Sequence, residues 1–392
     1  VYDRWGNMWL DWSSGVLVTS AGHGRPEIVD AIVEQAQKPL LHNYCFPSEI
    51  RAQTTEKMLE MTPDYLEKVF LLTTGSESTE CAFKLARTRG RSVGGEKKIG
   101  MVSFENAFHG RTLGAQMMGG KPGLKDWIGN VDPDMWQVPY PDGYWVEDTS
   151  FDLFLSTLEE QGVTPDMIAG VITETYQGSP AAFMPVDYVQ KLAGWCKEHD
   201  IVLIMDEVQA GFGRTGQEFG FMHYGVEPDL ICCGKGISSG LPLSAVIGRA
   251  ELMDQYEPGS MTSTHTGNPV CSAATLANLE IIQREKLWEN AARVGEVLQE
   301  ELRKLKEKYP RIIGCVRGKG LVAGLHIIKD GKKEPNPDLA FDIVESCVEK
   351  GLLFFSPVGR ATVKIAPPLV MTEDQVREGA SVIDEAIAEC LG

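Results

Sequence analysis

Short, unbroken apolar runs alternate with amphipathic segments of helical length from about Leu41 to Val270, and this alternation limits the possible folds most strongly. Runs that are apolar at every position are typical of parallel strands buried on both faces, because a strand with one exposed face would alternate with polar residues. We therefore expect an α/β sheet. The expected strands are residues 69–72, 101–104, 168–173, 201–205, 230–233 and 245–247.

The two ends of the chain predict a second, smaller unit. Residues 8–12 look like a short strand, and an amphipathic stretch follows Pro26. Beyond a helical region at 270–309, strand-like and helical segments predict an α+β unit. We expect an N-terminal segment (1–41) that joins the small domain, a large domain (42–275), and an interdomain helix with a small α+β domain (276–392).

Charge and cysteine usage restrict the class of protein. The formal net charge of −18 argues against a duplex nucleic-acid binder, which needs a basic face. No apolar run approaches the length of a membrane span. The nine cysteines form no CxxC pair and no metal-ligand spacing, so we expect reduced thiols, a cytoplasmic protein and no metal site. The chain opens on Val1 in the middle of a pattern, and we expect a further segment before it.

Two expected strands end in residues that can carry chemistry. Asp206 ends one apolar run, and Lys235, flanked by glycines, follows another. They are 29 positions apart, enough for one strand–helix–strand excursion that returns to the same edge of the sheet, where open α/β sheets bind ligands. A desolvated lysine can attack a carbonyl to form a Schiff base. The aspartate would then keep a pyridine nitrogen protonated. Each residue alone also fits an ordinary surface or capping role.

A third segment offers a phosphate site. Gly75 and Ser76 begin a predicted helix with Glu77 and Glu80 near its start and basic residues toward its end, an order that complements the helix dipole. Amide groups at a helix N-terminus bind anions. Taken alone, the segment equally fits a capped helix without a ligand.

The glycines Gly211, Gly213 and Gly216 satisfy the GxGxxG pattern of nicotinamide-binding folds. That motif needs a helix directly after the glycines, and the following QEFGFMHYG lacks a helical apolar period. We therefore expect the match to be accidental. An NAD-binding oxidoreductase and a non-catalytic protein of the same fold remain rival hypotheses.

Together, these motifs make the chain resemble the class III (ω-amino acid) aminotransferases of pyridoxal-phosphate fold type I. The resemblance covers essentially the whole chain and includes YDRWGNMWLDWSSG, TTGSESTE, FENAFHGRT, MDEVQAGFGRTG with PDLICCGKG, THTGNP and VKIAPPLVMTEDQ. It implies a large domain with a mostly parallel seven-stranded sheet, a smaller α+β domain and pyridoxal 5′-phosphate (PLP) as cofactor. It also explains the glycines of the GFGRTG segment as part of a turn that follows the aspartate in this family.

The resemblance implies roles for individual residues around the cofactor. Lys235 resembles the Schiff-base lysine and proton shuttle, and Asp206 the partner of the pyridine nitrogen. Gly75 and Ser76 resemble the phosphate-binding amides. Thr264 matches the threonine that reaches the phosphate of the neighbouring subunit, which implies a homodimer with shared active sites. Pairing of dimers into a tetramer is left open.

Five further positions are implied around the cofactor ring. Phe108 resembles the stacking aromatic, with His109 beside it; alone, they fit a core aromatic and a structural histidine. Val208 resembles the residue on the other face of the ring, and Gln209 the contact of its phenolic oxygen. Glu174 is retained in its family position and belongs with the cofactor-binding residues.

The implied substrate residues are Val16, Arg111, Ser179 and Lys364, and here the chain departs from 4-aminobutyrate aminotransferases. Arg111 matches an arginine that holds a substrate carboxylate, although alone it fits an exposed ion pair. Ser179 stands where the family has a glutamate, Thr175 where it has a proline, and Lys364 where an arginine is usual. Lysine lacks the bidentate fork of arginine, so substrates other than 4-aminobutyrate come into question.

We therefore expect a PLP-dependent aminotransferase that moves an amino group from an ω-amino acid or related amine, of the 4-aminobutyrate, β-alanine or taurine type, to a 2-oxo acid. A PLP-dependent amino-acid racemase or epimerase of the same family is the alternative.

Overall fold

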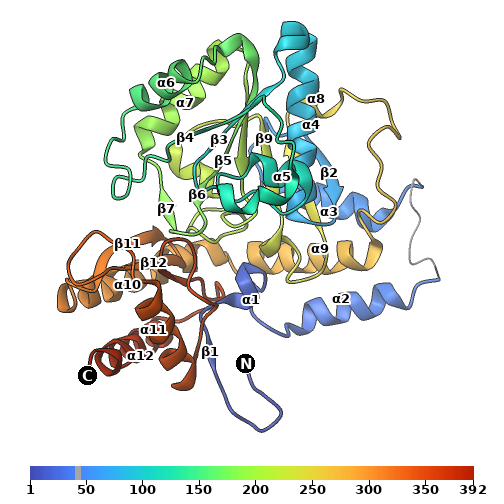
Figure 1. The fold of residues 1–392 in the computed structure, drawn as a ribbon. Coiled ribbons are helices and arrows are strands. Elements are labelled where there is room, and N and C mark those ends of the chain that lie inside the picture. The colour runs from blue at the N-terminus through green and yellow to red at the C-terminus, as the bar shows by residue number, and fades with distance from the viewer. Residues whose placement is uncertain (40–45) are drawn as a thin grey trace.

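A seven-stranded sheet organises the larger part of the chain in the computed structural model, which describes residues 1–39 and 46–392 (Figure 1). Its order is β2-β10-β9-β8-β5-β3-β4, and all neighbours are parallel except β10, which runs antiparallel to β2 and β9. The expected α/β fold is thereby confirmed. The strands are β2 (Lys68–Leu72), β3 (Gly100–Phe104), β4 (Met135–Val138), β5 (Ile168–Glu174), β8 (Val202–Asp206), β9 (Leu230–Cys233) and β10 (Ser244–Gly248).

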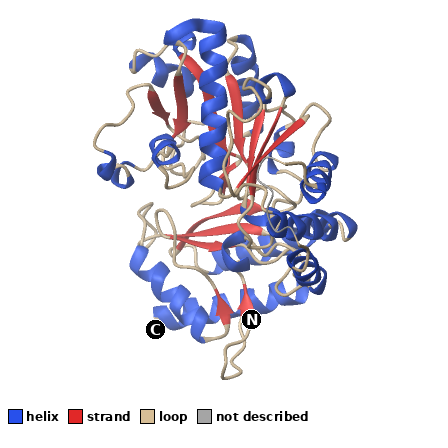
Figure 2. Ribbon diagram, turned by 90° about the vertical axis from the view of Figure 1, so that its right-hand side faces the viewer, coloured by secondary structure: helices blue, strands red, loops and turns tan. Residues whose placement is uncertain are grey.

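Both faces of this sheet are buried, as the unbroken apolar runs predict. Ile172 and Ile204 belong to one apolar cluster, which includes residues of helix α4 (Gly75–Gly94). Their chain neighbours Val171 and Leu203 belong to a second cluster, which includes residues of α7 (Val186–Glu198) and α9 (Pro269–Arg284). Side chains of a strand point alternately to its two faces, so the sheet lies between two helical layers (Figure 2).

Further helices complete the larger part of the chain. Helices α2 and α3 pack against α9, and α6 packs against α7 and β4. Their bounds are α2 (Pro26–Ala36), α3 (Glu49–Glu60), α5 (Leu113–Met118), α6 (Phe151–Glu160) and α8 (Ala250–Met253). A two-stranded hairpin, β6 (Tyr176–Gln177) and β7 (Ala182–Phe183), follows β5.

The C-terminal part contains an antiparallel sheet of order β11-β12-β14, with helices α10, α11 and α12 packed around it. Here β1 pairs in parallel with β13, so the two ends of the chain meet in one unit (Figure 1). The bounds are β1 (Leu10–Asp11), β11 (Ile313–Lys319), β12 (Val322–Ile327), β13 (Leu352–Leu353), β14 (Thr362–Ile365), α10 (Leu287–Lys308), α11 (Pro337–Glu349) and α12 (Glu373–Leu391). The domain limits stay predictions, and the one expected at 41/42 lies outside the described residues.

A short turn, α1 (Ser14–Leu17), has an unusual backbone. Ser14, Gly15, Val16 and Leu17 all have positive φ, between 46° and 67°. Non-glycine residues rarely adopt this left-handed conformation, and such strain is typical of functional sites. The turn packs against the 3-10 helix η6 (Lys235–Ile237). Within the described ranges, no helix is long and apolar enough to cross a membrane.

Candidate active site

The carboxyl ends of three central strands meet at a cavity of about 150 Å³. Glu174 ends β5 and Asp206 ends β8, and the register of the two strands places these residues side by side. Lys235 follows β9, the next strand of the sheet. The lining consists of Gly75, Ser76, Phe108, His109, Gly110, Glu174, Tyr176, Asp206, Val208, Gln209 and Lys235. The two expected chemical groups, Asp206 and Lys235, therefore do share one edge of the sheet.

Asp206 is buried and held in a fixed orientation. One carboxylate oxygen accepts a hydrogen bond from the amide of Val208 at 3.0 Å, and the other lies 2.8 Å from Nδ1 of His109. His109 is itself buried, and its Nε2 has no hydrogen-bond partner in the described part of the chain. His109 thus contacts Asp206 and fixes the orientation of that carboxylate.

Lys235 is poised for chemistry by its surroundings. Its φ of 42° lies in the left-handed region, where a lysine is strained. Burial lowers the pKa of its amine, while the nearby carboxylates of Asp206 and Glu174 act in the opposite direction. A lowered pKa raises the share of neutral amine, which is the nucleophilic form.

The start of α4 forms one end of the cavity. The hydroxyl of Thr74 caps the amide of Glu77, and the carboxylate of Glu77 accepts hydrogen bonds from the amides of Thr73 and Thr74. The amides of Gly75 and Ser76 are left without a protein partner among the described residues, at the positive end of the helix dipole.

Close packing requires the glycine at position 75. A Cβ there would lie 3.0 Å from Cγ1 of Val208, and a Cβ on Gly234 would lie 3.5 Å from Cα of Gly75. The start of α4 is therefore adjacent to both the Val208 wall and the loop that carries Lys235.

These features fit PLP. The two free amides of Gly75 and Ser76 are available to bind a phosphate. The amine of Lys235, with its lowered pKa, is available to react with the cofactor's carbonyl carbon, and the oriented carboxylate of Asp206 is available to bind a pyridine nitrogen. Phe108 and Val208 supply two of the walls. The cavity thus brings together the expected cofactor residues of this chain, apart from Thr264, which is exposed and does not line it.

Glu174 joins two loops at the cavity. Its carboxylate accepts hydrogen bonds from the amide of Phe108 at 3.1 Å and from the amide of Gly178 at 2.9 Å. Burial raises the pKa of this carboxyl group. Its contacts in this structure are thus with the backbone that shapes the cavity.

Lys364 lies behind the cavity wall rather than in it. It is 3% exposed, and its ammonium donates hydrogen bonds to the carbonyl of Gly178 and, at 2.5 Å, to Oε1 of Gln209. Because Oε1 is taken by Lys364, the amide nitrogen of Gln209 is the group left for other contacts. Burial lowers the pKa of Lys364 to about 7.

The other substrate candidates are placed around the cavity but do not line it. Ser179 directly follows Gly178, and its hydroxyl accepts a hydrogen bond from Lys121 at 2.9 Å. Arg111 is exposed, with its guanidinium 5.7 Å from the centre of the Phe108 ring. Val16 is 51% exposed on the strained turn that packs against η6.

Sequence reasoning missed Gly110 and Tyr176. A Cβ on Gly110, which has a φ of 140°, would clash with Oγ of Ser76 at 2.3 Å, so only glycine lets this loop pass the helix start. Gly110 directly follows His109, and Tyr176 lies two residues after Glu174; this closeness to expected site residues was the sequence feature that could have indicated them.

The glycine motif after β8 is not a dinucleotide site. Residues 207–219 form turns, and only the 3-10 helix η5 (Gly220–Tyr224) follows. Instead, the buried carboxylate of Glu207 accepts hydrogen bonds from the amides of Gly220 and Phe221, both at 2.8 Å, and from the hydroxyl of Thr175. The expectation that the GxGxxG match is accidental is confirmed.

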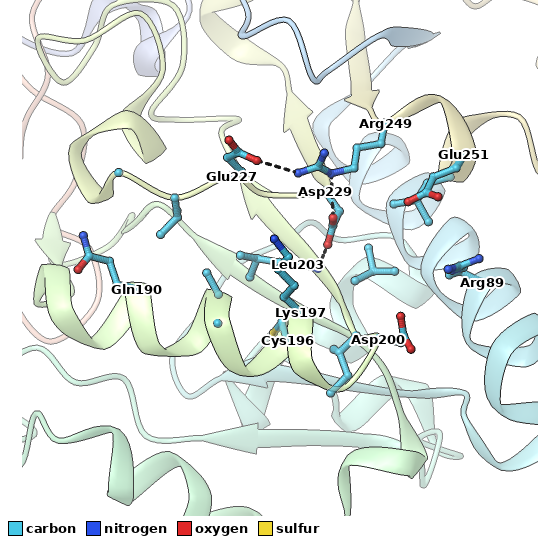
Figure 3. Close-up of a pocket in the computed structure, with 17 residues that line it drawn as sticks. Arg89, Gln190, Cys196, Lys197, Asp200, Leu203, Glu227, Asp229, Arg249 and Glu251 are labelled. Atoms are coloured by element: carbon cyan, nitrogen blue, oxygen red, sulfur yellow. Dashed lines mark hydrogen bonds and ion pairs between the residues drawn. The ribbon is translucent and has the colours of Figure 1, made fainter.

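A larger cavity of about 650 Å³ lies elsewhere, along α7 and near the amino ends of β8 and β9 (Figure 3). Three of its charged residues pair with one another: Arg249 binds Glu227 and Asp229, and Asp229 also accepts a hydrogen bond from the amide of Leu203. It lacks the free amides and reactive lysine of the smaller cavity, so size alone does not identify the active site.

Known proteins with similar sequences and structures agree with this geometry. The family model of the class III aminotransferases matches residues 1–387. A probable 4-aminobutyrate aminotransferase of Bacillus subtilis is 33% identical over 99% of this chain and 90% of its own length. An alanine/serine racemase of Pyrococcus horikoshii is 34% identical over 98% of this chain and 83% of its own. The solved structure of a PLP-bound amine transaminase from an uncultivated Pseudomonas species has a TM-score of 0.91, with 30% identity, over 99% of this chain and 92% of that one.

Proposed function

The chain belongs to the class III aminotransferases and is a PLP-dependent aminotransferase, and from this premise we propose that it moves an amino group from an ω-amino acid or related amine to a 2-oxo acid. The observation that carries the proposal is the cavity in which Lys235, Asp206 and the free amides of Gly75 and Ser76 converge. The names of similar proteins, 4-aminobutyrate and 5-aminovalerate aminotransferases, support this substrate class.

We assign roles to the residues that would hold the cofactor. Lys235 would hold PLP and, once displaced by the substrate amine, move a proton at the amine-bearing carbon. Asp206 would keep the pyridine nitrogen protonated. Bound PLP supplies an electron sink for the charge that this proton transfer leaves.

The remaining cavity residues position these groups. The amides of Gly75 and Ser76 would bind the phosphate, and Phe108 and Val208 would enclose the ring. The amide of Gln209 would contact the phenolic oxygen. His109 would act as a positioning residue by orienting Asp206. Glu174 would do so by holding the backbone amides of Phe108 and Gly178.

The two halves of an amino transfer can be measured separately. We expect an amine donor, added without acceptor, to remove the visible absorption of the bound cofactor, and a 2-oxo acid to restore it. β-Alanine, 4-aminobutyrate, taurine and branched-chain amino acids form the donor panel. No spectral change with any donor would argue against amino transfer.

Racemisation is a second candidate, because one relative of comparable identity is named an alanine/serine racemase. A racemase returns the proton to the same carbon and needs no oxo acid. Incubation of one enantiomer without oxo acid therefore distinguishes the two functions: optical rotation decays for a racemase and is retained for an aminotransferase.

We further propose a homodimer in which Thr264 of one subunit contacts the phosphate bound by the other. The exposed position of Thr264 is compatible with a contact outside its own subunit. Mixing inactive Lys235→Ala and Thr264→Ala subunits should restore activity if sites are shared; no restoration would contradict sharing.

We also propose a cytoplasmic location. The eight described cysteines are all free thiols, which supports this location, and cell fractionation would check it.

A further inference from the structure

A second cavity of about 360 Å³ adjoins the candidate active site and is not used by any role assigned above. It lies between the loop after β3, the turn between β6 and β7, and the loop before β14. Its lining includes Asn106, Lys121, Tyr140, Trp145, Ser179 and Arg360.

Glu174 connects the loops that line the two cavities. Its carboxylate binds the amides of Phe108 and Gly178. Asn106, two residues before Phe108, and Ser179, directly after Gly178, line the second cavity. A substrate whose amine reaches Lys235 could therefore place its other end here.

The second cavity contains two cations without an acidic partner. Neither Lys121 nor Arg360 lies within ion-pair distance of a carboxylate among the described residues; Lys121 donates a hydrogen bond to Ser179 at 2.9 Å, and the guanidinium of Arg360 lies 5.2 Å from the centre of the Trp145 ring. Burial lowers the pKa of Lys121, while the carboxylate of Glu174 acts in the opposite direction.

The acids of this cavity do not neutralise these cations. Asp142 accepts hydrogen bonds from the amides of Tyr144, Trp145 and Val146, and lies 3.9 Å from the guanidinium of Arg317. Glu105 is exposed, so water screens its charge. The cavity is thus left with a positive end.

Two residues that depart from the family pattern, Lys364 and Ser179, also favour the second cavity as the place where the substrate's acid group binds. Lys364 is engaged by Gly178 and Gln209 and does not line either cavity, so it holds no substrate carboxylate in this arrangement. Ser179, in place of a glutamate, leaves Lys121 without the acid that would otherwise stand beside it.

We propose that Lys121, Ser179 and Arg360 bind the terminal anionic group, a carboxylate or sulfonate, of the amino donor. This inference rests on the proposed aminotransferase function and names the substrate class of that site. Lys121 and Arg360 supply the opposite charges, and Ser179 supplies a hydroxyl that can donate to an anion.

The test compares ω-amino acids with amines of similar length that lack the acid: 4-aminobutyrate with butylamine, and 5-aminovalerate with pentylamine. Loss of one charge-assisted hydrogen bond costs roughly a factor of ten or more in binding. In Lys121→Gln we expect KM for the acids to rise at least about 10-fold, with kcat and the KM of the amines little changed. Ser179→Asp, which places an acid beside Lys121, should also raise KM for the acids.

Lys125→Gln is the matched control, since Lys125 follows on the same segment and does not line the cavity. It should behave as the wild type. Equal KM values for acids in the wild type and Lys121→Gln would overturn the proposal, as would an equal rise for acids and amines, or a wild type that accepts only amines. A wild type that reacts with no donor would instead overturn the aminotransferase function itself.

Discussion

At the scale of single residues, we expect the charge of Asp206 to determine activity. The carboxylate is buried, faces the cavity and is oriented by His109 and by the amide of Val208. Asp206→Asn keeps the size of the side chain but removes the charge that would hold a pyridine nitrogen protonated. We expect the rate of the first half-reaction to fall roughly 10²–10³-fold, measured from the loss of visible absorption.

The matched control is Asp200→Asn, an exposed acid that lines the distant larger cavity and has a φ of 51°, which asparagine tolerates. It should leave the rate unchanged. Equal rates in Asp206→Asn and the wild type would remove Asp206 from the mechanism.

Lys364 gives a second prediction at this scale, a dependence of stability on pH. Burial holds its folded-state pKa at about 7, below the ordinary lysine value of 10.5. Between these pH values the unfolded chain binds a proton that the folded protein lacks, so this residue makes the free energy of unfolding rise with pH. Below pH 7, burial of the charged amine costs stability in full.

Lys364→Met removes this dependence. We therefore expect the wild type to gain stability relative to the variant as pH rises from 7 to 10.5, measured as the difference in urea unfolding midpoints. A difference that stays constant across this range would show that the buried amine does not titrate there. The variant should also change the visible spectrum of the cofactor, because Gln209 loses the donor at its Oε1.

At the scale of elements, we assign the proposed phosphate site to the start of α4. A Cβ at position 75 would lie 3.0 and 3.2 Å from the methyl groups of Val208. Gly75→Ala should therefore narrow the cavity and lower the affinity for PLP roughly 10-fold or more, measured by titrating the apoenzyme. Gly194→Ala, in the middle of α7 with open space around it, is the control and should leave PLP affinity intact.

The elements also show which features the sequence could predict. The central strands were predictable because burial on both faces leaves few polar residues in them, mostly at their ends. β4 was missed because it reads MWQV at an edge of the sheet, with Gln137 half-buried. Glu80 was read as part of the charge order of α4, but its carboxylate accepts hydrogen bonds from the amides of Gly114 and Ala115 at the start of α5. Such a long-range cap has no local signature.

The cofactor site was predictable for a similar reason, since the carboxyl ends of parallel strands meet at one edge. The burial of Lys364 and the bond between Lys121 and Ser179 join segments from distant parts of the chain. Only the folded arrangement reveals these contacts.

At the scale of the whole molecule, Arg214 joins three parts of the chain. It is 1% exposed and donates hydrogen bonds to the carbonyls of Leu321, at 2.8 Å, and Pro367, and to Oγ of Ser14 at 3.3 Å. It thus ties the segment after β8 to the C-terminal unit and to the strained turn beside Lys235. Burial lowers its pKa to about 10.

Arg214→Met should leave these buried acceptors unpaired. We expect a loss of about 3 kcal/mol or more in the free energy of unfolding, measured by urea denaturation of the holoenzyme. Arg214→Lys keeps the charge but cannot reach all three acceptors, so its free energy of unfolding should lie between those of Arg214→Met and the wild type. An unchanged unfolding midpoint in Arg214→Met would contradict this role.

The most direct test of the whole account is to identify the lysine that holds the cofactor. The holoenzyme is reduced with borohydride, which makes the link between PLP and its lysine permanent, and the digested peptides are mapped by mass spectrometry. We predict that the cofactor is found on Lys235 and that Lys235→Ala shows no modified peptide. Cofactor on another lysine, such as Lys121 or Lys364, or none at all in the wild type, would contradict the account.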